Sequence, residues 1–194
     1  VLIKSLDVND HDAVFTVFNE FKQELGSLDR VIVNAGMGKG ASIGTGYFKA
    51  NKETAITNFV SAIAQCEAAV GIFRWQNAGH LVTISAIIAV RGFGRALTVY
   101  AATKAAITSL SEGIRIDLLR TPIKVSTIHP GFIRSEINEK VEKAPFMIDT
   151  ETGCKAIIKA IEKEGGNSYV PTWPWAILNP IMRVAPLSWL AKMS

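Results

Sequence analysis

The chain has 194 residues, of which 48% are hydrophobic and 20% are charged, and this composition suits one globular domain with a substantial core. The formal net charge is only +4 and no lysine or arginine cluster follows a helix face, so nucleic-acid binding is not expected. Cys66 and Cys154 lie far apart and the histidines lack ligand spacing, so we expect two buried reduced thiols and no metal site. No signal peptide is visible, which makes the cytoplasm the expected location.

Apolar runs of strand length alternate with helical periodicities along the chain. Asn9 or Asp10 can cap the first helix, and Pro122 closes a later one. The predicted strands cover 1–6, 31–33, 80–84, 124–128 and 168–170, and the predicted helices run from the cap to residue 25 and over 51–75, 101–120 and 151–164. Such alternation predicts an α/β fold, a parallel sheet with helices on both faces, and no linker divides residues 1–194.

Tyr100 and Lys104 are the most informative pair of residues. Because they are four positions apart on a predicted helix, their side chains share one face. A nearby cation lowers the pKa of a tyrosine, whereas burial raises it, so the lysine must lie close. A tyrosine tuned in this way can exchange a proton while a carbon–oxygen centre is oxidised or reduced. Taken alone, the pair also fits an ordinary solvated start of a helix.

Residues that can carry chemistry follow several of the predicted strands. Asp7, Asn34, Ser85 and Pro130 each come directly after or at the end of such a strand. The carboxyl ends of parallel strands meet at one edge of the sheet, where ligands of open α/β folds bind. The sequence therefore predicts a binding site at this edge.

Five motifs occur in a fixed order: Asn34-Ala35-Gly36, Asn58, Ser85, Tyr100 with Lys104, and Pro130-Gly131. Their order and approximate spacing resemble the short-chain dehydrogenase/reductase family over nearly the whole chain. The resemblance implies a three-layer Rossmann-like parallel sheet and an enzyme that moves a hydride between a nicotinamide cofactor and an alcohol or carbonyl. Neither the choice between NAD and NADP nor the substrate can be read from these residues.

The resemblance also implies roles for the residues nearest the reaction. Tyr100 would be the general acid/base, and Lys104 would lower its pKa and bind the nicotinamide ribose. Asn58 would hold a water in the proton relay, and its alternative is a buried amide that mends a helix kink.

Further residues would contact the cofactor according to the same resemblance. Asn34, Ala35 and Gly36 would pack beside the adenosine, or simply form a turn. Asp7 would meet the adenine amino group, or merely start a helix. The turn by the nicotinamide carboxamide would comprise Pro130, Gly131 and Ile133.

The first departure from the family pattern concerns the serine that orients the substrate oxygen. The family's position for it holds Ala86 here, and Ser85 comes one residue early. One residue along a strand turns the side chain to the opposite face. Either a local irregularity brings Ser85 round to a catalytic position, or the site lacks this serine.

The second departure is the absence of the family's glycine-rich phosphate turn before Val1. Gly36 and Gly40 lie in a glycine-rich loop, but no helix opens promptly after it. We therefore expect an incomplete sheet that lacks the family's strands 1 and 2, or a rearranged one in which 1–4 pairs with 31–33. The alternative to an enzyme is a truncated or non-catalytic member of the family, unable to bind cofactor, that acts through oligomer contacts.

The last part of the chain is apolar and is interrupted by prolines. Residues 134–150 are expected to form a substrate lid, with Phe146 and Met147 as its lining. The segment 174–194 would pack over the substrate cleft or contact another subunit, whereas contact with a membrane is possible but less favoured. The apolar lining is compatible with a lipophilic alcohol or ketone as substrate, but does not identify it. A dimer or tetramer through helices 51–75 and 101–120 is expected by analogy.

Overall fold

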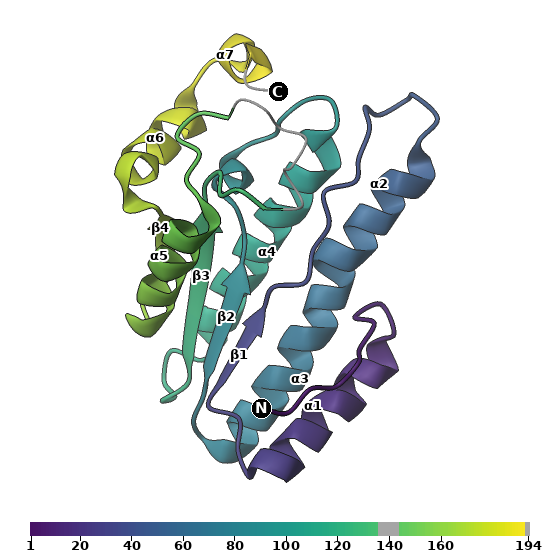
Figure 1. The fold of residues 1–194 in the computed structure, drawn as a ribbon, viewed down its shortest axis with the longest axis vertical. Coiled ribbons are helices and arrows are strands. Elements are labelled where there is room, and N and C mark those ends of the chain that lie inside the picture. The colour runs from purple at the N-terminus through teal and green to yellow at the C-terminus, as the bar shows by residue number, and fades with distance from the viewer. Residues whose placement is uncertain (136–143, 193–194) are drawn as a thin grey trace.

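The computed structural model describes residues 1–135 and 144–192 (Figure 1). Helices and strands alternate along the chain as the sequence predicts. In chain order they are α1 (His11–Leu25), β1 (Arg30–Val33), α2 (Phe48–Ala55), the π-helical turn η1 (Ile56–Val60), α3 (Ser61–Gln76), β2 (His80–Ile84), the 3₁₀ turn η2 (Ile87–Val90), α4 (Leu97–Asp117), β3 (Lys124–Pro130), α5 (Thr150–Glu162), β4 (Asn167–Val170), α6 (Thr172–Val184) and α7 (Leu187–Lys192).

The four strands form one parallel sheet in the order β1-β2-β3-β4. Neighbouring residues of β2 serve opposite faces: Leu81 packs with residues of α3 and α4, whereas Val82 packs with residues of α5. Helices thus cover both faces of the sheet (Figure 1), which confirms the three-layer Rossmann-like fold. The four parallel strands also fit the incomplete sheet that the sequence predicts.

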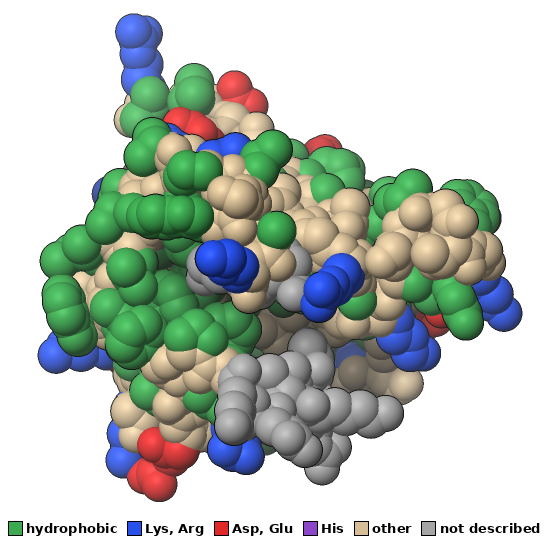
Figure 2. All heavy atoms as spheres, turned by 90° about the horizontal axis from the view of Figure 1, so that it is seen from above, with side chains coloured by type: hydrophobic (Ala, Val, Ile, Leu, Met, Phe, Trp, Pro, Cys, Tyr) green, Lys and Arg blue, Asp and Glu red, His purple; other side chains and the backbone are tan. Residues whose placement is uncertain are grey.

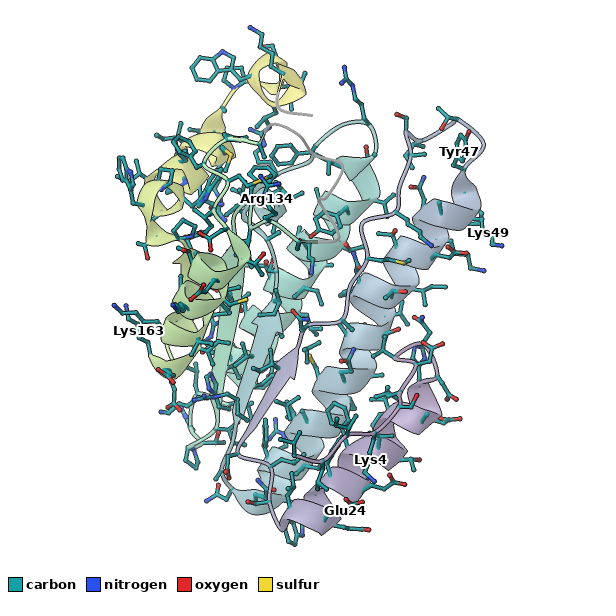
Figure 3. All side chains as sticks on the ribbon, in the orientation of Figure 1. Lys4, Glu24, Tyr47, Lys49, Arg134 and Lys163 are labelled. Carbon is teal, nitrogen blue, oxygen red and sulfur yellow. The ribbon has the colours of Figure 1, made fainter. Side chains whose placement is uncertain are left out.

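The prediction of a strand at residues 1–6 is wrong. Residues 1–7 run outside the sheet, and Lys4 forms ion pairs with Glu20 and Glu24 of α1 at 2.9 and 2.6 Å (Figure 3). A strand needs a neighbour to pair its backbone groups, but this segment follows α1 instead, and Leu6 packs near Val14. The rearranged sheet is wrong for the same reason, since β1 pairs only with β2 among the described residues.

The long predicted helix over 51–75 is present as α2, η1 and α3 in succession. By length and composition alone, Phe48–Gln76 could cross a membrane, but half of its most apolar window is buried inside the molecule. Cys66 and Phe73 of α3 lie in the main core, so this is the central core helix of the fold. Burial raises the pKa of the Cys66 thiol to about 12. Cys154, predicted to be buried, is exposed because it lies on the outward side of α5.

The C-terminal helices pack beside the carboxyl ends of the strands. Trp175 and Met182 of α6 and Leu190 of α7 share a buried cluster with η2 and α4. The central part of the predicted lid, residues 136–143, lies outside the described residues. Of its ends, Ile148 bridges to Ile133 and Phe146 contacts Trp175.

Candidate functional site

Lys104 joins the start of α4 to the end of β2. Its ammonium donates a hydrogen bond of 2.8 Å to the carbonyl of Ile84, the last residue of β2. The side chain is buried, with 6% of its surface exposed. The helix that carries Tyr100 is therefore fixed at the carboxyl edge of the sheet, where the sequence predicts a site.

The structure brings Lys104, Tyr100, Asn58 and Gly36 together. The Lys104 ammonium lies 5.8 Å from the centre of the Tyr100 ring. A Cβ placed on Gly36 would lie 3.4 Å from Asn58 Oδ1 and 3.7 Å from Lys104 Nζ. Four residues from three separate motifs thus lie close together beside the first turns of α4.

Burial dominates the ionisation of both members of the tyrosine–lysine pair. It raises the pKa of the Tyr100 phenol above its usual value of 10.0 and lowers the pKa of Lys104 from 10.5 to about 8. The sequence predicts a lowered pKa for Tyr100, and the structure differs because desolvation of the phenol outweighs the Lys104 ammonium, which lies 5.8 Å from the ring centre. The pair therefore combines a protonated phenol with an ammonium that gives up its proton more readily than an ordinary lysine does.

Asn58 holds the loop after β1 by both ends of its amide. Met37 N–H donates to Asn58 Oδ1 at 2.7 Å, and Asn58 Nδ2 donates to the Met37 carbonyl at 2.9 Å and to Thr103 Oγ1 at 3.3 Å. The residue lies in the π-helical turn η1, a local distortion that is frequent at functional sites. This geometry matches the predicted alternative of a buried amide at a helix distortion, and the water relay stays a prediction.

Two further polar residues of α2 hold the same loop, and sequence reasoning missed them. Asn51 accepts a hydrogen bond from Ala41 N–H at 3.0 Å and donates to the Ala41 carbonyl at 3.1 Å. The Thr54 hydroxyl donates to the carbonyl of Lys39. Asn51, Thr54 and Asn58 form what we call the amide clamp. Their spacing of three and four residues, which puts them on one helix face, was the available signal.

Ser85 is directed toward helix α4. Its hydroxyl donates to the Lys104 carbonyl at 2.9 Å, shares a hydrogen bond of 2.8 Å with Thr108 Oγ1, and is buried. Ala86, the next residue, packs in the cluster that includes Tyr100. The backbone at Ala86 is extended, so the two side chains point to opposite sides, and no irregularity brings Ser85 round. The structure thus places Ala86, with no hydroxyl, on the side of Tyr100.

An aromatic wall lies on the other side of Tyr100. We use this name for Phe132, Phe146 and Trp175, whose rings meet edge to face with centroids 6.0 and 5.8 Å from Trp175. Trp175 and Phe132 belong to the same cluster as Tyr100 and Ala86. The indole of Trp175 is 1% exposed, and within residues 1–135 and 144–192 its Nε1 has no hydrogen-bond partner.

Gly131 makes room for this wall. A Cβ at Gly131 would overlap the Trp175 indole at Nε1, so the absence of a side chain allows Trp175 to approach the turn. The same turn is held by a hydrogen bond of 2.7 Å from Gly131 N–H to the Val170 carbonyl. Ile133 packs against Gly153 of α5, where a Cβ would overlap its side chain. Packing thus explains the glycine at 131 without a cofactor, whose contact with Pro130, Gly131 and Ile133 stays a prediction.

The remaining predicted cofactor residues lie at the edge of the sheet and before α1. Asn34 is exposed and Ala35 is partly buried, directly after β1. The Asp7 carboxylate accepts a hydrogen bond of 2.9 Å from Asn9 N–H, in the turn that leads into α1. This arrangement matches the alternative in which Asp7 starts a helix, while its contact with adenine is untested.

Solved structures share this fold at low sequence identity. A short chain dehydrogenase from Burkholderia cenocepacia in complex with NADP superimposes with a TM-score of 0.84 and 20% identity, over 98% of this chain and 80% of that protein. ElxO with NADP bound gives a TM-score of 0.75 and 22% identity, over 86% of this chain and 74% of that protein. At these identities, the likeness establishes the fold alone.

Sequence comparisons identify relatives at higher identity than the solved structures do. An uncharacterized oxidoreductase of Mycobacterium tuberculosis is 46% identical over 186 residues, which are 96% of this chain and 74% of the relative. One from Myxococcus xanthus is 30% identical over 177 residues, which are 90% of this chain and 68% of that relative. Residues 1–145 match the family model described as short chain dehydrogenase. With this match and these relatives, the chain belongs to the short-chain dehydrogenase family.

Proposed function

We propose that the protein is an NAD(P)-dependent oxidoreductase that transfers a hydride between the nicotinamide and an alcohol or carbonyl compound, with Tyr100 as its general acid/base. The observation that carries the proposal is the approach of both Lys104 and Asn58 to Gly36, with the Lys104 ammonium 5.8 Å from the centre of the Tyr100 ring. Names of the M. tuberculosis and M. xanthus relatives, both oxidoreductases, support the reaction class.

The residues present fit one end of a dinucleotide. Lys104 uses one donor on the Ile84 carbonyl, and an ammonium has three, so it can also bind ribose hydroxyls. Gly36 leaves space next to this ammonium, because it has no side chain. The family's glycine-rich turn for the pyrophosphate does not occur in residues 1–194, so the fit concerns the nicotinamide ribose. When bound, the cofactor supplies or accepts the hydride.

The side chains of this protein handle the proton. In the reductive direction, the Tyr100 hydroxyl donates its proton to the carbonyl oxygen, and in the oxidative direction it takes one from the alcohol. Lys104, whose pKa burial lowers to about 8, is a stronger acid than an ordinary lysine and can return a proton to the phenolate. Asn58 keeps the adjacent loop in place through Met37 and would support a water in this relay.

We favour NADP as the first cofactor to test and a lipophilic alcohol or ketone as the substrate class. Two proteins with this fold hold NADP, which supports the order of testing without excluding NAD. The aromatic wall and Ala86 give Tyr100 apolar surroundings, which suit an apolar substituent on the reacting carbon.

We also propose a homodimer or tetramer in the cytoplasm. A shallow apolar groove of about 330 Å³ runs between η1 and α4, with Phe59, Val60, Val99 and Ala102 among its lining residues. This groove lies on the helices through which the sequence predicts subunit contact, and it would be covered by the same helices of another copy.

Cofactor titration tests the proposal before any substrate is known. The full-length protein is titrated with NADPH and with NADH, and nicotinamide fluorescence reports binding. We expect saturable binding of one or both, followed by cofactor oxidation in a screen of apolar aldehydes and ketones. If neither cofactor binds saturably, the proposed oxidoreductase activity is contradicted and the non-catalytic alternative is favoured. Lys104→Met should weaken NADPH binding. The matched control Lys124→Met should leave it unchanged, because Lys124 is the first residue of β3 and lies at the edge of the sheet opposite the site.

A further inference from the structure

Helix α6 has two different apolar faces. One face packs into the molecule through Trp175 and Met182, which are 1% and 6% exposed. The opposite face leaves Ile177, Ile181 and Val184 in solvent at spacings of four and three residues, as on one side of a helix. A helix that is apolar on both sides has more hydrophobic surface than the described part of the protein covers.

This exposed surface includes Trp173 near the start of α6 and continues past its end onto α7. We call it the α6–α7 face, and it consists of Trp173 (72% exposed), Ile177 (53%), Ile181 (48%), Val184 (81%), Leu187 (70%) and Trp189 (61%). Figure 2 shows hydrophobic side chains gathered on the left of the view, where α6 and α7 lie in Figure 1. Exposed apolar residues that cluster in this way mark interaction sites, whereas scattered ones need no explanation.

The charges on this part of the chain have one sign. Between residues 172 and 192 the only charged side chains are Arg183 and Lys192, both exposed, and no carboxylate interrupts the face. Two exposed tryptophans, Trp173 and Trp189, accompany them. Tryptophans and cations beside an apolar helix face are typical of segments that lie in the interface of a membrane with anionic lipids.

The length of α6 excludes a spanning segment. Its 13 residues measure about 20 Å, shorter than the roughly 30 Å of a hydrocarbon core, and Pro180 lies within it. A helix of this kind fits flat on a lipid surface, with its apolar side chains in the headgroup region. We infer that the α6–α7 face docks the protein on the surface of a bilayer that contains anionic phospholipids.

This docking would put the site next to a source of apolar compounds. The inner face of α6 belongs to the cluster that contains Tyr100 and Ala86, while its outer face would lie in the lipid interface. The inference does not depend on the proposed reaction, because binding to lipid requires neither cofactor nor turnover. Its failure would leave the proposed oxidoreductase intact.

Vesicle binding tests the inference directly. The full-length protein is sedimented with vesicles of phosphatidylcholine alone and of phosphatidylcholine with phosphatidylglycerol. We expect binding to the anionic vesicles, weakened by salt and by the double variant Arg183→Gln/Lys192→Gln. A Trp75→Phe background removes an exposed tryptophan of α3 and leaves the buried Trp175 with Trp173 and Trp189. There the total tryptophan emission should shift to shorter wavelength on binding, because Trp173 and Trp189 leave water. Absence of binding to both kinds of vesicle would overturn the inference.

A matched pair of variants identifies the surface. Ile177→Ser/Ile181→Ser removes two side chains from the α6–α7 face and should lower the partition onto anionic vesicles by about tenfold or more. Ile116→Ser/Leu119→Ser removes two side chains that are at least as exposed, at the end of α4, and should change it by less than about twofold. Circular dichroism checks that both variants fold. Equal losses of vesicle binding in the two variants would overturn the inference. It would also be overturned if the protein is a dimer that dissociates only in the Ile177→Ser/Ile181→Ser variant, because the face would then be a subunit interface.

Discussion

The two sides of Tyr100 are built by different forces. On one side, the amide clamp holds the loop after β1, and Asn51 and Asn58 each pair their donor and acceptor with one backbone residue. On the other side, Trp175 packs by shape, and its Nε1 has no partner among the described residues. Hydrogen bonds fix direction, whereas apolar packing fixes volume. In the proposed reaction, the polar side would position the proton chemistry and the aromatic side would surround the substrate.

The largest effect of a substitution on stability at neutral pH is expected on the aromatic side. Gly131→Ala puts a methyl group into the volume of the buried Trp175 indole, so we expect a loss of about 3 kcal/mol in the free energy of unfolding. Gly113→Ala, in α4 with nothing within 4 Å of the new Cβ, should stabilise the protein by about 0.5–1 kcal/mol. Urea unfolding measures both, and shifts of the same sign would contradict the packing explanation of Gly131.

The polar side can be broken at Asn58. Asn58→Leu leaves the N–H and carbonyl of Met37 without their partner, and we expect a cost of about 2–3 kcal/mol. Asn19→Ala is the matched control, since this exposed amide donates a single bond to its own helix, and its effect should stay within about 0.5 kcal/mol. Chemical unfolding compares the two. A cost for Asn58→Leu no larger than the control's would show that the clamp does not hold the loop.

Lys104 gives the polar side a pH dependence. Burial lowers its pKa from 10.5 to about 8, so between these values the unfolded chain binds a proton that the folded chain has released. Lys104 therefore increases the free energy of unfolding as pH rises from about 8 toward 10.5, by about 1.4 kcal/mol per pH unit. Lys104→Met lacks this contribution, and denaturant unfolding of both proteins at several pH values measures the difference.

The raised pKa of Cys66 acts in the opposite direction above pH 9, because the unfolded thiol ionises while the folded one stays protonated. It is common to wild type and Lys104→Met and cancels in their difference. Parallel stability curves for the two proteins over this range would refute the lowered pKa of Lys104.

The smallest effects are expected for Ser85→Ala, which distinguishes a structural role of this serine from a catalytic one. Ser85→Ala removes hydrogen bonds to the Lys104 carbonyl and to Thr108, but Thr108 Oγ1 still donates to that carbonyl at 3.0 Å. We expect a loss of about 1 kcal/mol in stability and a change in kcat of less than about threefold. A loss in kcat of a hundredfold at unchanged stability would restore the predicted catalytic serine.

The sequence predictions that the structure confirms are those based on residues with a regular spacing. The alternation of apolar strands and helices predicted the three-layer sheet, because buried parallel strands and amphipathic helices leave periodic patterns. Tyr100 and Lys104 lie on one helix, so their proximity followed from local geometry. The prediction for residues 1–6 was wrong because an apolar run reveals strand propensity, but not whether a neighbour is available to pair with.

Contacts between distant segments could not be read from the sequence. Gly131 and Trp175 are packed closely although they are 44 positions apart in the sequence, and no periodicity encodes such a contact. The direction of Ser85 depended on whether the backbone stayed extended at Ala86, which the residue types leave open. The pKa of Tyr100 required the balance between burial and a cation, which depends on distances rather than on spacing.

The most direct test of the proton role of Tyr100 compares wild type with Tyr100→Phe in NADPH oxidation, using a carbonyl compound that the wild type reduces. The phenol is removed while the ring and its apolar contacts remain. The account predicts NADPH binding within about threefold of wild type and a loss in kcat of about 10²–10⁴-fold. Equal kcat in the two proteins would contradict it.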